Sequence, residues 1–257
     1  MRIGVQTFTI RKFQKKNIEE AYLPLIKMGI KDFEVARIDF NIENAQLIKE
    51  LVDKYSINIV SIQVKPKLVK EEINDLVYFC KTVGCKNIVI SMLPFKCILG
   101  KEEIFYEFIN SLDELYDIYQ EEGITLAYHH HNWEYVKVSN GNTRMHELLA
   151  NTNKIKFIHD TYWTTKCGIS PIKQIKEFNN RLLGIHLRDL TLYKKGISVL
   201  SKDTFIGDGV IDFKMVIDEA LKTNCEYFVI EQKTDNPYEC LEKSYKYFKN
   251  IGLEIED

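Results

Sequence analysis

The amino-acid sequence predicts one (β/α)8 TIM barrel, an α/β fold that spans residues 1–257 as a single domain. Three observations support this prediction. Short runs rich in β-branched and aromatic residues alternate with amphipathic stretches about every 30 residues, which is typical of βα units. Eight such runs can be counted, and the length of 257 residues is close to the roughly 250 of a typical barrel. No linker or low-complexity segment divides the chain.

Eight segments are expected to be the strands of this barrel. Each is short and enriched in Val, Ile, Phe or Tyr, as strands are. In chain order they begin near Ile3, Lys31, Ile57, Asn87, Ile124, Ile155, Leu182 and Tyr227. Because helical segments separate them, we expect the strands to be parallel.

The segments between the strands are expected to be helices. Residues 18–28 are amphipathic, and Pro24 predicts a kink or an early break there. The stretch 102–122 predicts the longest helix, and residues 191–209 predict a polar loop of roughly twenty residues that forms a lid over the carboxyl-end face. Several helical segments stop where a left-handed glycine belongs, at Gly29, Gly84 and Gly123.

Composition limits the classes of function. The chain is 45% apolar and 28% charged, and its net charge of −2 comes from interleaved signs, so nothing suggests binding to nucleic acid or to an anionic membrane. No apolar run approaches the roughly 18 residues of a membrane span, and residues 1–5 resemble a strand more than a signal peptide, so we expect a cytoplasmic protein. The six cysteines include no C-x-x-C motif and are expected to be free thiols.

Residues with metal-ligand side chains stand at the ends of four of the predicted strands. The fifth strand ends in three consecutive histidines, and alternation places His129 and His131 on one face and His130 on the other. The next three strands end in Asp160, His186 and Glu231. Because the carboxyl ends of parallel barrel strands converge on one face, these side chains are expected to meet in one site.

Other strand ends carry polar or aromatic side chains. Gln6, Glu34 and Gln63 end the first three strands, where either hydroxyl-binding groups of a substrate site or ordinary polar packing is expected. Trp163 is expected to form an apolar wall for a sugar ring, with plain packing as the alternative. Arg188 is expected either to hold an anionic oxygen or to pair with Asp189 or Glu231. The remaining histidines, His130, His146 and His159, are expected to be structural.

Five motifs on successive strands carry a resemblance to a known family. They are Ile-Gly-Val-Gln-Thr-Phe-Thr-Ile-Arg at 3–11, Asp-Thr-Tyr-Trp at 160–163, His-Leu-Arg-Asp at 186–189, Gly-Asp-Gly-Val-Ile-Asp-Phe at 207–213 and Ile-Glu-Gln at 230–232. In this order the chain resembles, over nearly its whole length, the sugar phosphate isomerase/epimerase superfamily of xylose isomerase-like TIM barrels. Inosose dehydratase, tagatose and psicose 3-epimerases and endonuclease IV belong to the same group.

The resemblance implies one divalent metal ion, held by residues that end strands five to eight. Relatives usually have glutamate, aspartate, histidine and glutamate there, and the matching positions are His129, Asp160, His186 and Glu231. His129 departs from this pattern, because it replaces a carboxylate. A set of two imidazoles and two carboxylates favours Mn²⁺ or another transition metal, with Co²⁺, Fe²⁺, Zn²⁺ and Mg²⁺ as alternatives.

The resemblance also implies an isomerase, epimerase or dehydratase that acts on a sugar, keto-sugar or cyclitol. Such enzymes abstract a proton next to a carbonyl through a metal-stabilised enediolate. The family's epimerases use two metal-bound carboxylates, of which only Glu231 remains here. The second acid-base group is then His131 or Glu134, or else a single base suffices, as in the dehydratase relatives.

Two further alternatives follow from the same residues. The histidine at position 129 also fits a metal-free barrel that has lost catalysis and acts as a sugar-binding or regulatory protein. Endonuclease IV-like repair is disfavoured, because it needs a three-metal cluster and Trp163 stands where a further ligand would be required. Relatives are often dimers or tetramers, which implies a homo-oligomer.

Overall fold

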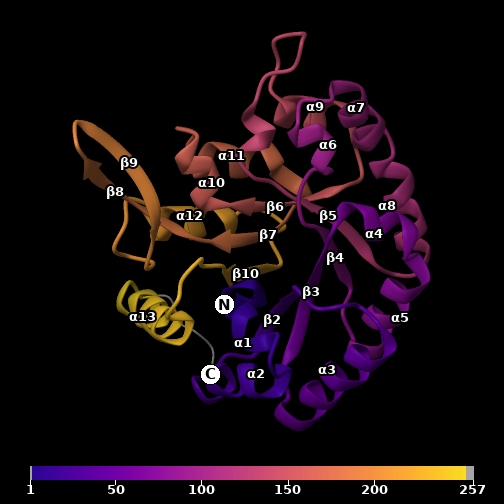
Figure 1. The fold of residues 1–257 in the computed structure, drawn as a ribbon, viewed down its shortest axis with the longest axis vertical. Coiled ribbons are helices and arrows are strands. Elements are labelled where there is room, and N and C mark those ends of the chain that lie inside the picture. Colours follow the sequence, from indigo (N-terminus) through magenta and orange to yellow (C-terminus); the bar gives the residue numbers. More distant parts are fainter. Residues whose placement is uncertain (1, 253–257) are drawn as a thin grey trace.

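Eight parallel strands close into a barrel in the computed structural model, which describes residues 2–252 (Figure 1). Around the barrel the order is β1, β10, β7, β6, β5, β4, β3 and β2. The strands are β1 (Ile3–Gln6), β2 (Asp32–Ala36), β3 (Asn58–Val64), β4 (Asn87–Ile90), β5 (Thr125–His129), β6 (Lys156–Asp160), β7 (Leu182–Leu187) and β10 (Tyr227–Ile230). The predicted (β/α)8 barrel is confirmed, and each barrel strand begins within two residues of the expected position.

The helices lie outside the strands and cover the barrel (Figure 1). They are α1 (Arg11–Gln14), α2 (Ile18–Lys27), α3 (Ile42–Tyr55), α4 (Pro66–Glu71), α5 (Ile73–Val83), α6 (Phe95–Ile98), α7 (Glu102–Asn110), α8 (Leu112–Glu121), α9 (Arg144–Asn151), α10 (Thr161–Lys166), α11 (Pro171–Phe178), α12 (Phe213–Ala220) and α13 (Pro237–Asn250), with 3-10 turns η1 (Thr7–Ile10), η2 (Trp133–Tyr135) and η3 (Asn179–Arg181). Among the described residues, no helix has the length and apolar character that crossing a membrane requires.

A period of two along the strands separates an apolar layer from a polar layer inside the barrel. Six buried side chains form the apolar layer: Val89, Ala127, Ile158, Leu183, Tyr227 and Val229. Two residues further along three of these strands, His129 follows Ala127, Asp160 follows Ile158 and Glu231 follows Val229. The carboxyl-end site therefore lies next to a buried hydrophobic layer.

Helix ends agree with the sequence at the glycines but not everywhere. Gly29, Gly84 and Gly123 all have positive φ angles, as expected for left-handed residues after a helix. The early break expected at Pro24 is wrong, because α2 continues through this proline to Lys27. A proline removes only one amide donor, and here only one further turn of helix follows it.

The expected longest helix over residues 102–122 is also wrong, because it is split into α7 and α8 at Ser111. The Ser111 amide and hydroxyl both bond to the carbonyl of Phe108, at 3.1 and 2.8 Å, which tightens the chain into a turn there. The longest helices are α3 and α13, with 14 residues each.

The segment expected as a polar loop is a β-hairpin that stands apart from the barrel strands (Figure 1). Its strands β8 (Asp189–Lys195) and β9 (Ser198–Thr204) are antiparallel, and a two-residue turn of Gly196 and Ile197 joins them. Gly196 has a φ of 63°, the conformation that such tight hairpin turns require. Gly196 lies between two runs that contain Leu192, Tyr193, Val199 and Leu200. A glycine between two such runs indicates a hairpin, and the prediction of a loop did not take it into account.

Candidate metal centre

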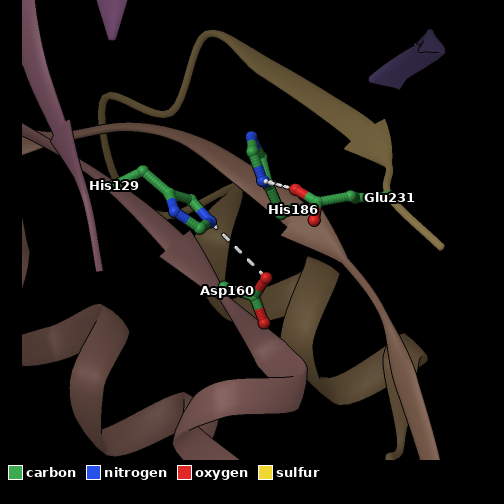
Figure 2. Close-up of side chains that lie close together, drawn as sticks. All are labelled: His129, Asp160, His186 and Glu231. Atoms are coloured by element: carbon green, nitrogen blue, oxygen red, sulfur yellow. Dashed lines mark hydrogen bonds and ion pairs between the residues drawn. The ribbon is translucent and has the colours of Figure 1, made fainter. Parts of the chain in front are cut away.

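Four side chains with metal-ligand atoms meet at the carboxyl end of the barrel (Figure 2). They are His129, Asp160, His186 and Glu231, all buried, and one ligand atom from each lies within 4.8 Å of the others. Adjacent strands bring the middle pair together, because Asp160 on β6 is in register with His186 on β7. The structure thus gathers the four residues that the strand ends pointed to.

His129 and Asp160 have the features expected of ligands. His129 Nε2 lies 3.5 Å from Asp160 Oδ2, and within residues 2–252 neither ring nitrogen of this buried histidine has a hydrogen-bond partner. Asp160 Oδ1 accepts a hydrogen bond of 2.9 Å from the amide of Trp163 and so caps α10, which fixes the carboxylate and leaves Oδ2 toward the cluster. Buried polar atoms without partners are costly, and a bound cation would satisfy them.

His186 is held between two carboxylates. Its Nδ1 lies 2.9 Å from Glu231 Oε2, and its Nε2 lies 2.8 Å from Glu34 Oε1. Ligating histidines in metal sites commonly donate their other ring N–H to a carboxylate, which fixes the tautomer and the ring orientation. The geometry therefore leaves Nδ1 as the nitrogen that faces the other ligands.

Glu34 is fully buried beside the cluster. Its Oε2 accepts hydrogen bonds from the Ser61 hydroxyl at 2.5 Å and the Tyr227 hydroxyl at 3.1 Å. Its Oε1 lies 2.8 Å from His186 Nε2 as an ion pair, without the alignment of a hydrogen bond. The Tyr227 ring fits only because residue 184 is glycine, where an added Cβ would lie 2.7 Å from ring atoms. Glu34 is thus placed to orient His186, and its expected role in binding a substrate hydroxyl is disfavoured.

Arg188 brings a guanidinium cation to the site. Its Nη1 lies 3.1 Å from Glu231 Oε1 and 3.4 Å from Asp160 Oδ2, and its Nη2 lies 2.9 Å from Asp203 Oδ1 on β9. Of the expected partners, Glu231 is therefore present and Asp189 is not. Asp203 was missed, because the sequence gives no register between β9 and the barrel.

Asp189 instead anchors the base of the hairpin. Its carboxylate accepts hydrogen bonds from the amides of Leu190, Gly207, Gly209 and Ile211, at 2.8 to 3.3 Å. A buried carboxylate with this many backbone donors is a structural element of the loop.

The charges in the site stabilise one another. Burial alone would lower the pKa of His186, but Glu34 and Glu231 raise it to about 10. Burial opposes ionisation of Glu231, yet Arg188 and His186 lower its pKa to about 2. Burial would raise the pKa of Asp160, but Arg188 and His129 hold this pKa well below its usual range. Without metal, two carboxylates and a protonated His186 thus coexist at neutral pH.

His131 lies beside the cluster in an aromatic setting. Its ring centroid is 4.7 Å from that of His129, 4.9 Å from Trp133 and 5.3 Å from Trp163. Burial, followed by the charge of His129, lowers the pKa of His131 to about 3, so the imidazole is neutral near pH 7. Its Nδ1 is buried and has no hydrogen-bond partner in the described chain, as is also true of Trp163 Nε1. Both nitrogens are therefore buried without a protein partner in the described residues.

Glu134 is held away from the cluster. Its carboxylate accepts hydrogen bonds from the Tyr128 hydroxyl and, at 2.7 Å, from the His131 amide. Burial raises its pKa above the usual range. These contacts favour a role in positioning His131 over the expected alternative in which Glu134 swings into the site.

The remaining strand-end residues bond among themselves. Gln6 Nε2 donates to Gln63 Oε1 at 2.9 Å, and Gln6 Oε1 accepts from the Phe8 amide, so this pair orders the first strand ends. His130 Nε2 lies 3.3 Å from His159 Nδ1, and both rings pack near Phe178 of α11, outside the barrel. His146 is exposed on α9. These three histidines lie where a structural role was expected.

The fold and the buried cluster define a TIM barrel with a four-residue candidate metal site at its carboxyl end. The chain belongs to the xylose isomerase-like TIM barrel family, whose profile matches residues 25–251. It is similar to inosose dehydratase of Clostridium perfringens, with 26% identity over 202 residues, which cover 66% of this chain and 67% of the relative. The matches to some other inosose dehydratases span only 55% of their length.

Solved structures show the same fold. A sugar phosphate isomerase/epimerase from Parabacteroides distasonis has a TM-score of 0.79 at 18% identity, with 98% of this chain and 99% of that chain covered. A xylose isomerase-like TIM barrel protein from Mycobacterium smegmatis, in complex with magnesium, has a TM-score of 0.72 at 11% identity, with coverage of 98% and 96%. At these identities the likeness concerns the fold.

Proposed function

We propose that the protein is a metal-dependent enzyme that acts on a sugar, keto-sugar or cyclitol by removing a proton next to a carbonyl. The observation that carries this proposal is a cluster of four buried side chains at the carboxyl-end face, those of His129, Asp160, His186 and Glu231. In TIM barrels this face is where active sites lie. The similarity to proteins named inosose dehydratase supports the substrate class.

The donor set fits one divalent cation. Two imidazoles and two carboxylates favour Mn²⁺ over Mg²⁺, whose preferred ligands are all oxygens, and Fe²⁺, Co²⁺ and Zn²⁺ are the competing ions. His186 would bind through Nδ1, because Nε2 faces Glu34. When bound, the cation would polarise the substrate carbonyl and stabilise negative charge on its oxygen.

Glu231 is the residue that we assign as the base. It is 7% exposed, whereas His129, Asp160 and His186 are at most 1% exposed, so it is the cluster carboxylate that a substrate reaches most readily. Arg188 Nη1 and His186 Nδ1 fix its two oxygens and so set the direction from which it approaches a C–H bond. The half-buried aromatic face of Trp163 supplies a wall for a hydroxylated ring.

We propose one-base chemistry, which gives a dehydratase or an aldose–ketose isomerase. With histidine at position 129, Glu231 is the single cluster carboxylate near the accessible surface, and Glu134 is already bonded to Tyr128 and His131. The neutral imidazole of His131 is the group that could supply a second base and make the enzyme an epimerase.

Incubation of the Mn²⁺-loaded protein in D₂O with inososes and ketohexoses, followed by NMR, tests this function. We expect deuterium next to the carbonyl on one face only, and loss of exchange after metal removal. Deuterium delivered to the opposite face, with the 3-epimer as the main product, would contradict one-base chemistry. In that case His131→Gln should abolish epimerisation. No exchange with any of these compounds would count against the proposed reaction for unphosphorylated substrates.

One observation favours a second candidate, a metal-free sugar-binding barrel. Arg188 already neutralises Asp160 and Glu231, so both carboxylates have a protein cation as a partner. Metal titration separates the two candidates, because a metal-free binding protein would bind sugars equally well with and without added Mn²⁺.

A further inference from the structure

We propose that Arg11 and Arg37 form a subsite for the carboxylate of an acidic substrate, such as a sugar acid, beside the candidate metal centre. The inference rests on the proposed function, because the carboxylate would belong to the molecule whose carbonyl lies at the cluster. Both arginines follow barrel strands at the carboxyl-end face. Arg11 comes after β1 and the 3-10 turn η1, and Arg37 directly follows β2. β1 lies between β2 and β10, and Glu231 directly follows β10.

The ring of Phe8 brings the two guanidinium groups together. The Cζ atom of Arg11 lies 3.9 Å from the centroid of this ring, and the Cζ atom of Arg37 lies 5.2 Å from it. Arg11 Nη1 also donates a hydrogen bond of 2.8 Å to the carbonyl of Phe8, which fixes the direction of the Arg11 side chain. Contacts with an aromatic face hold the two cations in place but leave them without an anionic partner.

Neither arginine has a counter-ion in the part of the chain that the structure describes. Within residues 2–252, no carboxylate oxygen lies within 4.0 Å of a guanidinium nitrogen of Arg11 or Arg37. The carboxylate of Asp235 acts on Arg11 but is paired with Lys12 at 2.6 Å. Burial and then the charge of Arg37 lower the pKa of Arg11, as expected for two cations that lie close together. An anion bound by both guanidinium groups would offset this repulsion.

The backbone of Arg37 supports a functional role for this residue. Its φ is 63°, in the left-handed region that favours glycine. In the described chain, the other non-glycine residues with positive φ, Ser56 and Asn179, end the helices α3 and α11, whereas Arg37 follows a strand. The Thr7 hydroxyl bonds to both the amide and the carbonyl of Ala36, at 2.8 and 3.0 Å, and so holds the chain next to Arg37. Residues kept in such conformations by their surroundings cluster at functional sites.

The surroundings favour a ligand with one negative charge. Glu231 opposes the lowering of the Arg11 pKa, so the proposed base lies within electrostatic reach of the subsite. A carboxylate is repelled by Glu231 less than a phosphate group, which carries roughly two negative charges. A guanidinium group also matches a planar carboxylate with two parallel hydrogen bonds. A neutral sugar or cyclitol would leave both arginines without a counter-ion.

Calorimetric titration of galacturonate and of galactose into the metal-free protein tests the subsite. We expect galacturonate to bind at least about tenfold more tightly than galactose, because charged hydrogen bonds replace a hydroxyl contact. Arg37→Gly should remove this preference and keep the fold, since glycine suits a φ of 63°. Arg37→Asn, which also tolerates the left-handed conformation, should do the same. Arg37→Lys should retain part of the preference, because it keeps the charge.

Two matched controls separate the loss of charge from the change of backbone. Lys16→Met removes an exposed cation just after α1, and Ser56→Gly introduces glycine at the left-handed residue that ends α3. Both variants should bind galacturonate like the wild type. Urea denaturation should show Arg37→Gly to be about as stable as the wild type, so that a loss of binding is not a loss of fold.

Three results would overturn the inference. One is equal affinity of the wild type for galacturonate and galactose, or binding of neither. Another is an unchanged preference for galacturonate in Arg37→Gly and Arg37→Asn. The third is tighter binding of galactose 6-phosphate than of galacturonate, which would contradict a site for a carboxylate.

Hydrogen exchange in D₂O separates this inference from the proposed function. With the Mn²⁺-loaded protein we expect faster exchange on 5-ketogluconate than on fructose, and a preference that falls toward one in Arg37→Gly. Exchange on fructose without any preference for galacturonate in the titrations would reject the subsite and leave the function standing. A preference for galacturonate that depends on Arg37, without exchange on either ketose, would support the subsite and reject the function.

Discussion

The ring of His186 is held by Glu34, whose Oε1 lies 2.8 Å from His186 Nε2 on the side away from Glu231. The two residues come from strands far apart in the sequence, β7 and β2, and both are fully buried. Such a carboxylate keeps a ligating imidazole in one tautomer and increases its basicity. Glu34 is therefore a positioning residue of the candidate metal centre.

Glu34→Gln should lower metal affinity by about 10-fold to 100-fold, the usual effect of losing such a partner. The amide keeps the shape of the side chain but removes the charge that holds His186. Competition with a chromophoric chelator measures the affinity. Glu50→Gln, an exposed change on α3, is the control. Equal affinity in Glu34→Gln and the wild type would show that Glu34 does not act on the metal site.

Metal affinity should rise with pH. Glu34 and Glu231 raise the pKa of His186 to about 10, from an ordinary value of 6.5, so the metal-free protein carries a proton there that coordination must displace. We expect affinity to increase by about tenfold per pH unit between about pH 7 and 8.5. A profile without slope in this range would contradict a protonated His186.

The same shift affects the stability of the metal-free protein. Because the folded-state pKa of His186 is raised, its stabilising contribution is fully present below pH 6.5 and is lost as the pH rises toward 10. Urea denaturation of metal-free protein at several pH values measures this loss.

Glu231→Gln should reduce turnover by about 10²-fold to 10⁴-fold, the range typical of a lost acid-base group. The amide oxygen can still coordinate, so metal content should be affected less than turnover. Glu226→Gln, exposed at the other end of the same strand region, is the matched control. Turnover like that of the wild type in Glu231→Gln would reject its role as the base.

Asp189→Ala should destabilise the protein by about 2–4 kcal/mol, because four backbone amides lose one buried acceptor. Chemical denaturation measures the change in the free energy of unfolding. Asp208→Ala, an exposed aspartate in the same loop, should change stability by less than about 0.5 kcal/mol. If both variants were equally stable, the carboxylate would not anchor the hairpin.

The barrel and its four ligand-type residues could be predicted from the sequence because both depend on local patterns. Each strand is a short apolar run, and the period of two fixes which residue at its end faces inward. Asp160 and Glu231 stand two residues after the buried Ile158 and Val229, so each pair points to the same side of its strand. The inward direction of Asp160 and Glu231 therefore follows from the local pattern alone.

Contacts between distant segments could not be predicted in this way. The pairing of Glu34 with His186 depends on where the Glu34 carboxylate lies. The Tyr227 hydroxyl bonds to that carboxylate, and the Tyr227 ring fits only beside a glycine at position 184. The pairing of Arg188 with Asp203 depends on how the hairpin folds back onto the barrel. The break at Ser111 comes from a hydroxyl that bonds to its own helix, and a helical periodicity does not reveal it.

Metal content is the most direct test of the central claim, that the buried cluster holds one functional divalent ion. The wild type and His186→Ala would be purified without chelator, reconstituted with Mn²⁺, desalted and compared by elemental analysis. We expect about one equivalent in the wild type and close to none in the variant, since one of four ligands is lost. Equal metal in both proteins, or none in either, would contradict the claim.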